Sequence, residues 1–295
     1  MRITACRLCP RRCGADRTRV RGYCGGGAAP RIARAALHFW EEPCLSGERG
    51  SGTVFFSGCP LRCCYCQNHA ISAGNYGQDI TPGRLSEIFL ALAAQGAHNI
   101  NLVSPTPHVP WIIEALGMAG GALSIPVVYN TGGYESVETL RALAGMVDVY
   151  LPDIKYRSGE LSSRYSSAPD YFAHAARAVE EMARQTGPAV FDERGIMTRG
   201  VLIRHLAIPG CWRDSVAILR WIAENLPREG IRVSLMRQYT PMHESARFYE
   251  INRRLTTYEY QKITDTAAEL GLLGYTQLPE AAGAQYVPSF DLTGV

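Results

Sequence analysis

Three cysteines of the chain are spaced so that one tight loop can bring their thiols together. Cys59, Cys63 and Cys66 form a C-x3-C-x2-C pattern directly after an apolar run that reads as a strand. Because each thiolate binds one iron, three such thiols can hold three corners of a cuboidal iron–sulfur cluster and leave the fourth iron open to a small molecule. A zinc site completed by His69 or Cys64 is the alternative, and the spacing favours the cluster.

A second set of cysteines stands at the start of the chain, in the pattern C-x2-C-x3-C-x10-C. It consists of Cys6, Cys9, Cys13 and Cys24. Four thiols give full ligation for one metal centre, and both zinc and a closed [4Fe-4S] cluster fit that number. Free thiols or a disulfide are further alternatives. The remaining cysteines, Cys44, Cys64 and Cys211, are expected to be buried small apolar residues.

The composition suits one large globular domain with a small appendage. The chain has 295 residues, of which 46% are hydrophobic and 19% charged, and its net charge is +3. These values exclude disorder and coiled coil. The sequence shows neither a membrane span nor a secretory h-region, so we expect a cytoplasmic protein in which clustered cysteines bind metals. Residues 1–27, which end in three glycines, are predicted to form the cysteine-rich appendage and 28–295 the main domain.

From residue 51 onward, short apolar runs alternate with segments of helical period. The predicted strands cover 52–57, 99–103, 127–130, 147–151, 201–206 and 232–235. The predicted helices cover 85–94, 137–143, 171–184, 215–226 and 258–270, with N-caps at Thr81, Ser136 and Asp214. This alternation predicts an α/β fold with a parallel sheet, either a partial barrel or a doubly wound sheet. In both, functional side chains gather at the carboxyl ends of the strands.

The cysteine triplet and its surroundings resemble the radical S-adenosylmethionine (SAM) superfamily. Within it, the chain resembles the proteins related to pyruvate formate-lyase activating enzyme. The resemblance is carried by the segments 6–14, 38–44, 51–58, 66–68, 96–103, 151–155 and 204–210. It implies a partial (β/α)6 barrel of parallel strands. It also implies that Cys59, Cys63 and Cys66 hold a [4Fe-4S] cluster whose open iron binds the amino and carboxylate groups of SAM.

The resemblance further implies reductive cleavage of SAM to a 5′-deoxyadenosyl radical, which then abstracts a hydrogen atom from a substrate. A Gly-Gly-Glu motif usually binds the SAM amino group at the end of the second strand. Here that place reads Val-Ser-Pro-Thr-Pro-His, so Ser104 and Thr106 are predicted to substitute for the missing glutamate. His108 is a further candidate there.

Other candidates follow the later strands. Lys155 is predicted to supply a cation for the SAM carboxylate, and Asn130, Thr131 and Asp153 offer oxygens for a monovalent cation beside it. Asp153 and Lys155, two residues apart, are expected to point to the same side, with an ion pair that closes a loop as the alternative. Arg204 and His205 on the fifth strand are expected to face a polar site. Arg204 is predicted to reach the ribose or carboxylate of SAM, and Gln238 and Tyr239 to frame the adenine.

The leading hypothesis is therefore a radical SAM enzyme that abstracts hydrogen from a protein or peptide target. The alternatives are a radical SAM enzyme acting on a small molecule and a non-catalytic iron–sulfur electron-transfer or scaffold protein. The arginines of residues 1–27 favour an acidic reductant of the flavodoxin or ferredoxin kind. Nucleic acid is not favoured, because this segment lacks interleaved aromatic residues. The tail 277–295 is expected to close over the mouth of the barrel.

Overall fold

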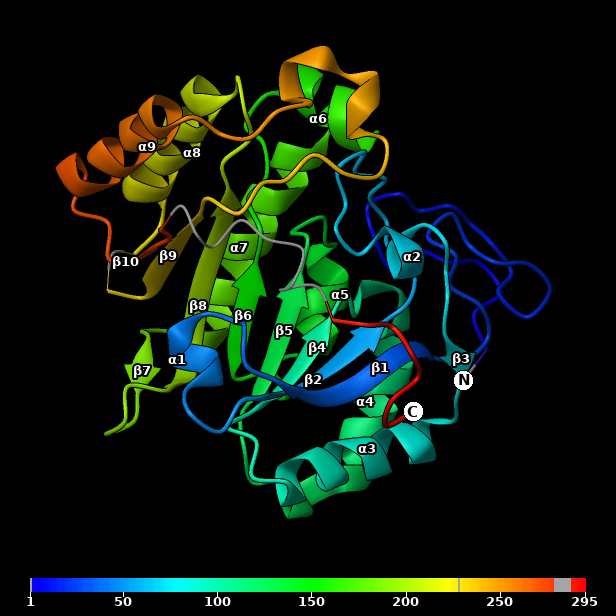
Figure 1. The fold of residues 1–295 in the computed structure, drawn as a ribbon. Helices are drawn as coiled ribbons and strands as arrows, with labels where there is room; N and C mark the ends of the chain where they lie inside the picture. Colours follow the sequence, from blue (N-terminus) through cyan, green and yellow to red (C-terminus); the bar gives the residue numbers. More distant parts are fainter. Residues whose placement is uncertain (1, 228, 279–287) are drawn as a thin grey trace.

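The computed structural model describes residues 2–227, 229–278 and 288–295, and its centre is a twisted, mostly parallel sheet (Figure 1). The parallel strands are β2 (Ser51–Phe56), β4 (Ile100–Val103), β5 (Val127–Thr131), β6 (Val149–Pro152), β8 (Met197–Leu206), β9 (Ile231–Met236) and β10 (Gly274–Thr276). The antiparallel strands are β1 (Arg31–His38), β3 (Gln78–Asp79) and β7 (Val190–Phe191). The order is β10-β9-β8-β6-β5-β4-β2-β1-β3, with β7 paired to β8, so the sheet curves without closing.

The predicted fold class, a partial barrel of parallel strands, is confirmed. The six predicted strands correspond to β2, β4, β5, β6, β8 and β9. Their residues are almost all buried, as expected for strands covered on both faces. The flanking strands β1, β3, β7 and β10 were not predicted, because they are short or lie in segments without a clear apolar run.

Helices cover the outer face of the sheet and pack on its apolar side chains (Figure 1). These helices are α3 (Pro82–Ala94), α4 (Val109–Ala119), α5 (Val137–Ala142), α7 (Tyr171–Thr186), α8 (Trp212–Asn225) and α9 (Thr257–Glu269). The Thr81 and Ser136 side chains cap α3 and α5 as predicted. The predicted cap Asp214 is wrong: α8 begins at Trp212, and the Asp214 carboxylate accepts the amide hydrogens of Arg157 and Ser158 instead.

The inner face of the sheet is partly filled by the connection between β1 and β2. Its short helix α1 (Pro43–Ser46) packs Cys44 and Leu45 against the interior of β5, β6 and β8. The neighbouring residues Glu41 and Glu42 therefore enter the interior as well. Two further short helices, α2 (His69–Ser72) and α6 (Gly159–Ser166), flank the cysteine loop. Among the described residues, no helix is long and apolar enough to cross a membrane.

Both ends of the chain are anchored on the sheet. Residues 2–27 contain neither helix nor strand and lie beside α2 and the β3 edge (Figure 1). Of the predicted closing tail, residues 279–287 lie outside the described residues. The end of the tail pairs with β1, where the amide of Ala35 donates to the carbonyl of Thr293 at 2.8 Å. The Phe290 ring packs edge-on against Phe55 on the inner face of the sheet. The described parts of the tail therefore lie toward opposite edges of the sheet: residues 277–278 follow β10, and residues 288–295 pack on β1.

Candidate active site

The loop with the cysteine triplet follows β2 and is fixed by contacts with distant segments. The amide of Cys59 donates to the carbonyl of Cys24 at 3.1 Å, and the amide of Cys64 donates to the carbonyl of Tyr165 at 2.9 Å. Gly58, with φ of +90°, starts the loop, and a Cβ atom there would lie 2.5 Å from the Cys24 oxygen. Glycine is therefore required by both conformation and space.

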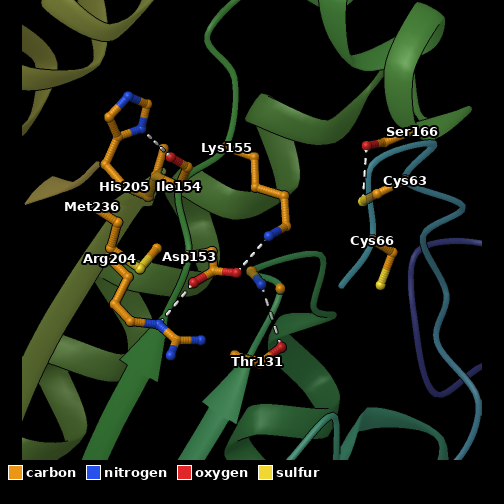
Figure 2. Close-up of polar contacts among 12 residues, drawn as sticks. Cys63, Cys66, Thr131, Asp153, Ile154, Lys155, Ser166, Arg204, His205 and Met236 are labelled. Carbon is orange, nitrogen blue, oxygen red and sulfur yellow. Dashed lines mark hydrogen bonds and ion pairs between the residues drawn. The ribbon is translucent and has the colours of Figure 1, made fainter. Parts of the chain in front are cut away.

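The three thiols are half-buried and lie in one environment. Desolvation raises the pKa of Cys59, Cys63 and Cys66, that of Cys63 to about 11; Cys63 and Cys66 further raise the pKa of Cys59, and Cys66 that of Cys63. The Lys155 ammonium has the opposite effect and lowers the pKa of all three thiols. The hydroxyl of Ser166 donates to Cys63 Sγ at 3.0 Å, as Figure 2 shows. Half-buried neighbouring thiols beside a cation and a hydroxyl donor fit the ligand set of an iron–sulfur cluster, because metal binding requires them as thiolates.

The zinc alternative for this loop depends on a fourth ligand close to the three thiols. In a tetrahedral zinc site with Zn–S of about 2.3 Å, the thiolates lie about 3.8 Å apart. Within the described parts of the chain, no three His, Cys, Asp or Glu side chains are grouped so as to hold a metal ion. The proposed fourth ligands also lie elsewhere, since His69 stacks on His243 and Cys64 packs in an apolar cluster. A cuboidal cluster spaces its thiolates more widely than a single ion does.

A charged network lies next to the cysteine loop, at the carboxyl ends of β6 and β8. Lys155 Nζ and Asp153 Oδ2 are 2.5 Å apart, and Arg204 Nε donates to Asp153 Oδ1 at 2.9 Å. Figure 2 shows Lys155 between Asp153 and the loop that carries Cys63. Burial raises the pKa of the Asp153 carboxyl, but Arg204 and Lys155 outweigh this effect and hold that pKa below its ordinary value. Asp153 and Lys155 thus do point to one side, as predicted.

Arg204 connects this network to two further residues. Its Nη2 donates to Asn130 Oδ1 at 2.6 Å, and its Nη1 lies 3.3 Å from Glu41 Oε2. Glu41 was not predicted as a site residue, and neither was Glu42, whose pKa burial raises to about 7. The sequence feature that could have indicated these residues is an acidic pair within an otherwise apolar stretch before α1. The position of the pair inside the sheet follows from α1, which fills the inner face.

Adjacent residues of β8 face opposite sides of the sheet. Arg204 faces the interior, whereas His205 faces the helices and binds the carbonyl of Ile154 through Nδ1 at 2.7 Å. The expectation that both face one polar site is wrong, because side chains alternate along a strand.

Thr106, predicted at the SAM amino group, and Thr131, predicted at a monovalent cation beside SAM, both point toward a buried glutamate. Thr106 Oγ1 donates to Glu135 Oε1 at 2.5 Å, and Thr131 Oγ1 donates to the same oxygen. Burial raises the pKa of Glu135 to about 7. His108 is also buried, with Nε2 2.8 Å from the Ser57 carbonyl oxygen. These contacts tie the ends of β4 and β5 together, and a role of both threonines at SAM stays a prediction.

The remaining candidates lie along the inner edge of the sheet. Ser104 adopts φ of +58° at the end of β4, and its amide donates to the carbonyl of Asn130. Gln238 accepts a hydrogen bond from Gln277 and lines a cavity of about 510 Å³ that is open to solvent. Tyr239 lies deeper, and its hydroxyl donates to the Ile251 carbonyl at 2.8 Å. Besides Gln238, the cavity of about 510 Å³ is lined by Phe39, Trp40, Glu41, Pro43, Ser46, Gly47 and Gln277.

The four cysteines of the N-terminal set come together in residues 2–27. Cys6, Cys9 and Cys24 are buried and Cys13 is exposed. The predicted appendage has no helix or strand of its own and lies against the cysteine loop. The boundary at residue 27 stays a prediction, as does the nature of a metal at these thiols.

Comparison with known proteins places this architecture in a family. Residues 53–198 match the model of the radical SAM superfamily. The uncharacterized protein MJ0674 of Methanocaldococcus jannaschii is 31% identical over 284 residues, which cover 90% of this chain and 75% of that protein.

Solved structures agree in fold at low identity. The hydrogenase maturase HydG of Carboxydothermus hydrogenoformans superposes with a TM-score of 0.51 at 14% identity, over 80% of this chain and 59% of that one. Methylornithine synthase (PylB) gives 0.50 at 14% identity, over 74% and 68%. The chain described here belongs to the radical SAM superfamily.

Proposed function

We propose that this enzyme uses a [4Fe-4S] cluster on Cys59, Cys63 and Cys66 to cleave SAM reductively and to abstract hydrogen from a peptide or protein. When bound, the cluster and SAM supply the 5′-deoxyadenosyl radical. The observation that carries the proposal is the placement of three half-buried thiols beside the Lys155–Asp153 pair. Both lie at the carboxyl edge of a parallel sheet, where such folds bind their ligands.

The residues of the chain position SAM and keep its charges compensated. Lys155 is proposed to bind the SAM carboxylate, which would then share the ammonium with Asp153. Arg204 is held by Asp153, Asn130 and Glu41 and is proposed to present its guanidinium to the ribose or carboxylate. We further propose the following contacts: Ser104 and Thr106 at the amino group, Gln238 at the adenine, and Asn130, Thr131 and Asp153 around a monovalent cation.

The test of this chemistry is anaerobic. The protein is reconstituted with iron and sulfide, mixed with SAM and dithionite, and assayed for 5′-deoxyadenosine by mass spectrometry. Cys63→Ala should lose both product and iron, whereas the adjacent Cys64→Ala should keep both. Product formation by Cys63→Ala at the wild-type rate would refute the assignment. A wild-type protein with a fully loaded, reducible cluster and no product would instead support the electron-transfer alternative.

A peptide target is supported by the open cavity beside Glu41 and Gln238, since a sealed cavity would suit a small molecule better. It is also supported by the resemblance to activating enzymes, which act on a glycine backbone. The test is to add separately the macromolecular and the small-molecule fractions of host cells to the SAM cleavage assay. Stimulation that disappears after protease treatment supports a protein target. Stimulation by the small-molecule fraction alone contradicts it.

We also propose that Cys6, Cys9, Cys13 and Cys24 hold a second metal centre and that a flavodoxin- or ferredoxin-type protein supplies the electrons. The support is that the four thiols come together in a segment that carries seven arginines and one aspartate. Either zinc or a [4Fe-4S] cluster would satisfy four thiolates.

A further inference from the structure

The thiols of the N-terminal set lie near one another in residues 2–27, since Cys6 and Cys13 both act electrostatically on Cys24, and Cys6 and Cys24 both act on Cys9. A Cβ atom at Gly22 would lie 3.5 Å from Cys13 Sγ and 3.6 Å from Cys24 Sγ. The amide of Gly26 lies 3.4 Å from Cys24 Sγ and donates to it. The backbone at Arg11 makes the equivalent contact with Cys9. These N–H groups point at the sulfur atoms, as backbone donors do around cysteines that bind a metal.

A buried cation beside these thiols lacks a counter-charge. Arg17 is 3% exposed, and its guanidinium contacts the Pro107 carbonyl at 2.5 Å and Cys24 Sγ at 3.5 Å. Its Nε atom has no hydrogen-bond partner, and among the described residues no carboxylate forms an ion pair with Arg17. An uncompensated buried charge is costly. Neutral thiols cannot compensate it, but four thiolates around a dication or a [4Fe-4S]2+ core carry a net charge of about −2.

This set is joined directly to the loop of the first cluster. The hydrogen bond from the Cys59 amide to the Cys24 carbonyl links a ligand residue of one set to a ligand residue of the other. Arg11 Nε donates to the Pro60 carbonyl at 2.9 Å, and Arg62 donates to the Tyr23 carbonyl at 2.8 Å. These contacts attach the appendage to the loop and place the two cysteine sets next to each other.

The opposite side of the set faces solvent and carries more arginines than carboxylates, although Arg12, Arg19 and Arg21 lie 3.6–3.9 Å from the carboxylates of Glu138, Asp16 and Asp79, respectively. Cys13 is exposed, and exposed arginines surround it in sequence. They are Arg7, Arg12, Arg19 and Arg21. An acidic protein is attracted to such a surface and can approach the exposed ligand.

We propose that Cys6, Cys9, Cys13 and Cys24 hold a second [4Fe-4S] cluster that relays single electrons from an acidic protein donor to the cluster at Cys59, Cys63 and Cys66. The path runs through Cys24 and the amide of Cys59, and Arg17 compensates the charge of the second cluster. A reduced flavodoxin- or ferredoxin-type donor loses one electron, the second cluster gains it and passes it on, and no bond is made or broken. This inference rests on the proposed function.

Metal analysis tests the cofactor itself. Wild-type protein reconstituted anaerobically should hold about eight irons per chain, whereas Cys24→Ala and the triple variant Cys59/Cys63/Cys66→Ala should each hold about four. Cys211→Ala serves as the cysteine control and should hold the wild-type amount. A stoichiometric zinc in protein purified without added metal, retained in the triple variant and lost from Cys24→Ala, would overturn the inference.

Comparison of reductants tests the relay. Dithionite is small and reaches the first cluster directly, so Cys24→Ala should still show its reduction by electron paramagnetic resonance. With a flavodoxin as the only donor, the first cluster of Cys24→Ala should stay oxidised, whereas that of wild type should be reduced more slowly as salt increases. Equal reduction by flavodoxin in both proteins would refute the relay. Because this readout follows cluster reduction and needs no SAM cleavage, it separates failure of the relay from failure of the proposed function.

A change of Arg17, which contacts Cys24 Sγ, tests the charge argument without removing a ligand. Arg17→Gln keeps hydrogen-bonding capacity but removes the cation, and it should lower the retention of the second cluster by about 10-fold or more. Arg17→Lys should restore most of the retention. Unchanged iron content in Arg17→Gln, with the first cluster intact, would contradict the role given to this residue.

Discussion

Arg204 on β8 is paired directly with Asp153 at the end of the adjacent strand β6, with Nε 2.9 Å from Oδ1. The same guanidinium contacts Asn130 on β5 and Glu41 from the β1–β2 connection. One buried cation thus joins the ends of three parallel strands to the segment that fills the inner face. This network lies beside the cysteine loop and sets the charges that SAM would meet.

Removal of Arg204 should destabilise the fold. Arg204→Met leaves Asp153 and Glu41 as buried carboxylates with one cation fewer, which should cost about 3–5 kcal/mol in the free energy of unfolding. The double variant Arg204→Met/Glu41→Gln should lose less than the sum of the single changes, because the two residues are coupled. Urea unfolding of the four proteins measures this, and strict additivity would show that the contact contributes little.

Loss of the Lys155 ammonium should impair SAM cleavage more than folding. Lys155→Met removes the cation that acts on all three cysteines and on Asp153, so 5′-deoxyadenosine formation should fall by about 10–100-fold. Lys155→Arg keeps the charge and should retain more activity. Iron content and the unfolding midpoint serve as controls. Formation of 5′-deoxyadenosine by Lys155→Met at the wild-type rate would contradict a role of Lys155 at the SAM carboxylate.

A side chain at Gly58 should disturb the cysteine loop. Gly58→Ala places Cβ 2.5 Å from the Cys24 carbonyl oxygen at φ of +90°, which costs about 1–3 kcal/mol and breaks the contact between the two cysteine sets. Iron retention should fall. Gly117→Ala is the matched control, because no atom lies within 4 Å of its added Cβ and alanine favours a helix by about 0.5–1 kcal/mol. Equal iron retention in both variants would disprove the expected clash.

Glu259 should make the protein sensitive to acid. The Arg253 guanidinium, 2.7 Å away, and the helix cap at Thr256 lower the pKa of this carboxyl to about 2 although it is largely buried. Since the folded pKa lies below the unfolded value, the stabilisation is fully present above about pH 5 and is lost as pH falls toward 2.

Glu259→Gln removes this ion pair and should lower the free energy of unfolding at pH 7 by about 3 kcal/mol at most. At pH 3 the difference from wild type should shrink. Denaturant unfolding at both pH values measures it. A difference that stays constant from pH 7 to pH 3 would show that the carboxylate charge does not contribute.

The spacing of the cysteines and the alternation of apolar runs already determined much of this protein. Cys59, Cys63 and Cys66 follow a strand, and their ligand types limit the chemistry they can support. The central strands were predicted because residues buried on both faces form continuous apolar runs. Asp153 and Lys155 were placed on one side by the period of a strand. All of these features are local in the sequence.

Only the tertiary structure decided which distant segments meet. Glu41 lies 163 residues from Arg204 along the chain, and Cys24 contacts Cys59 from a segment without helix or strand. Thr106 and Thr131 read as ligand candidates, yet their hydroxyls donate to Glu135. Hydrogen bonds and ion pairs of this kind depend on how the sheet curves and what fills its inner face. No local pattern encodes that, because packing between remote elements determines which polar groups become neighbours.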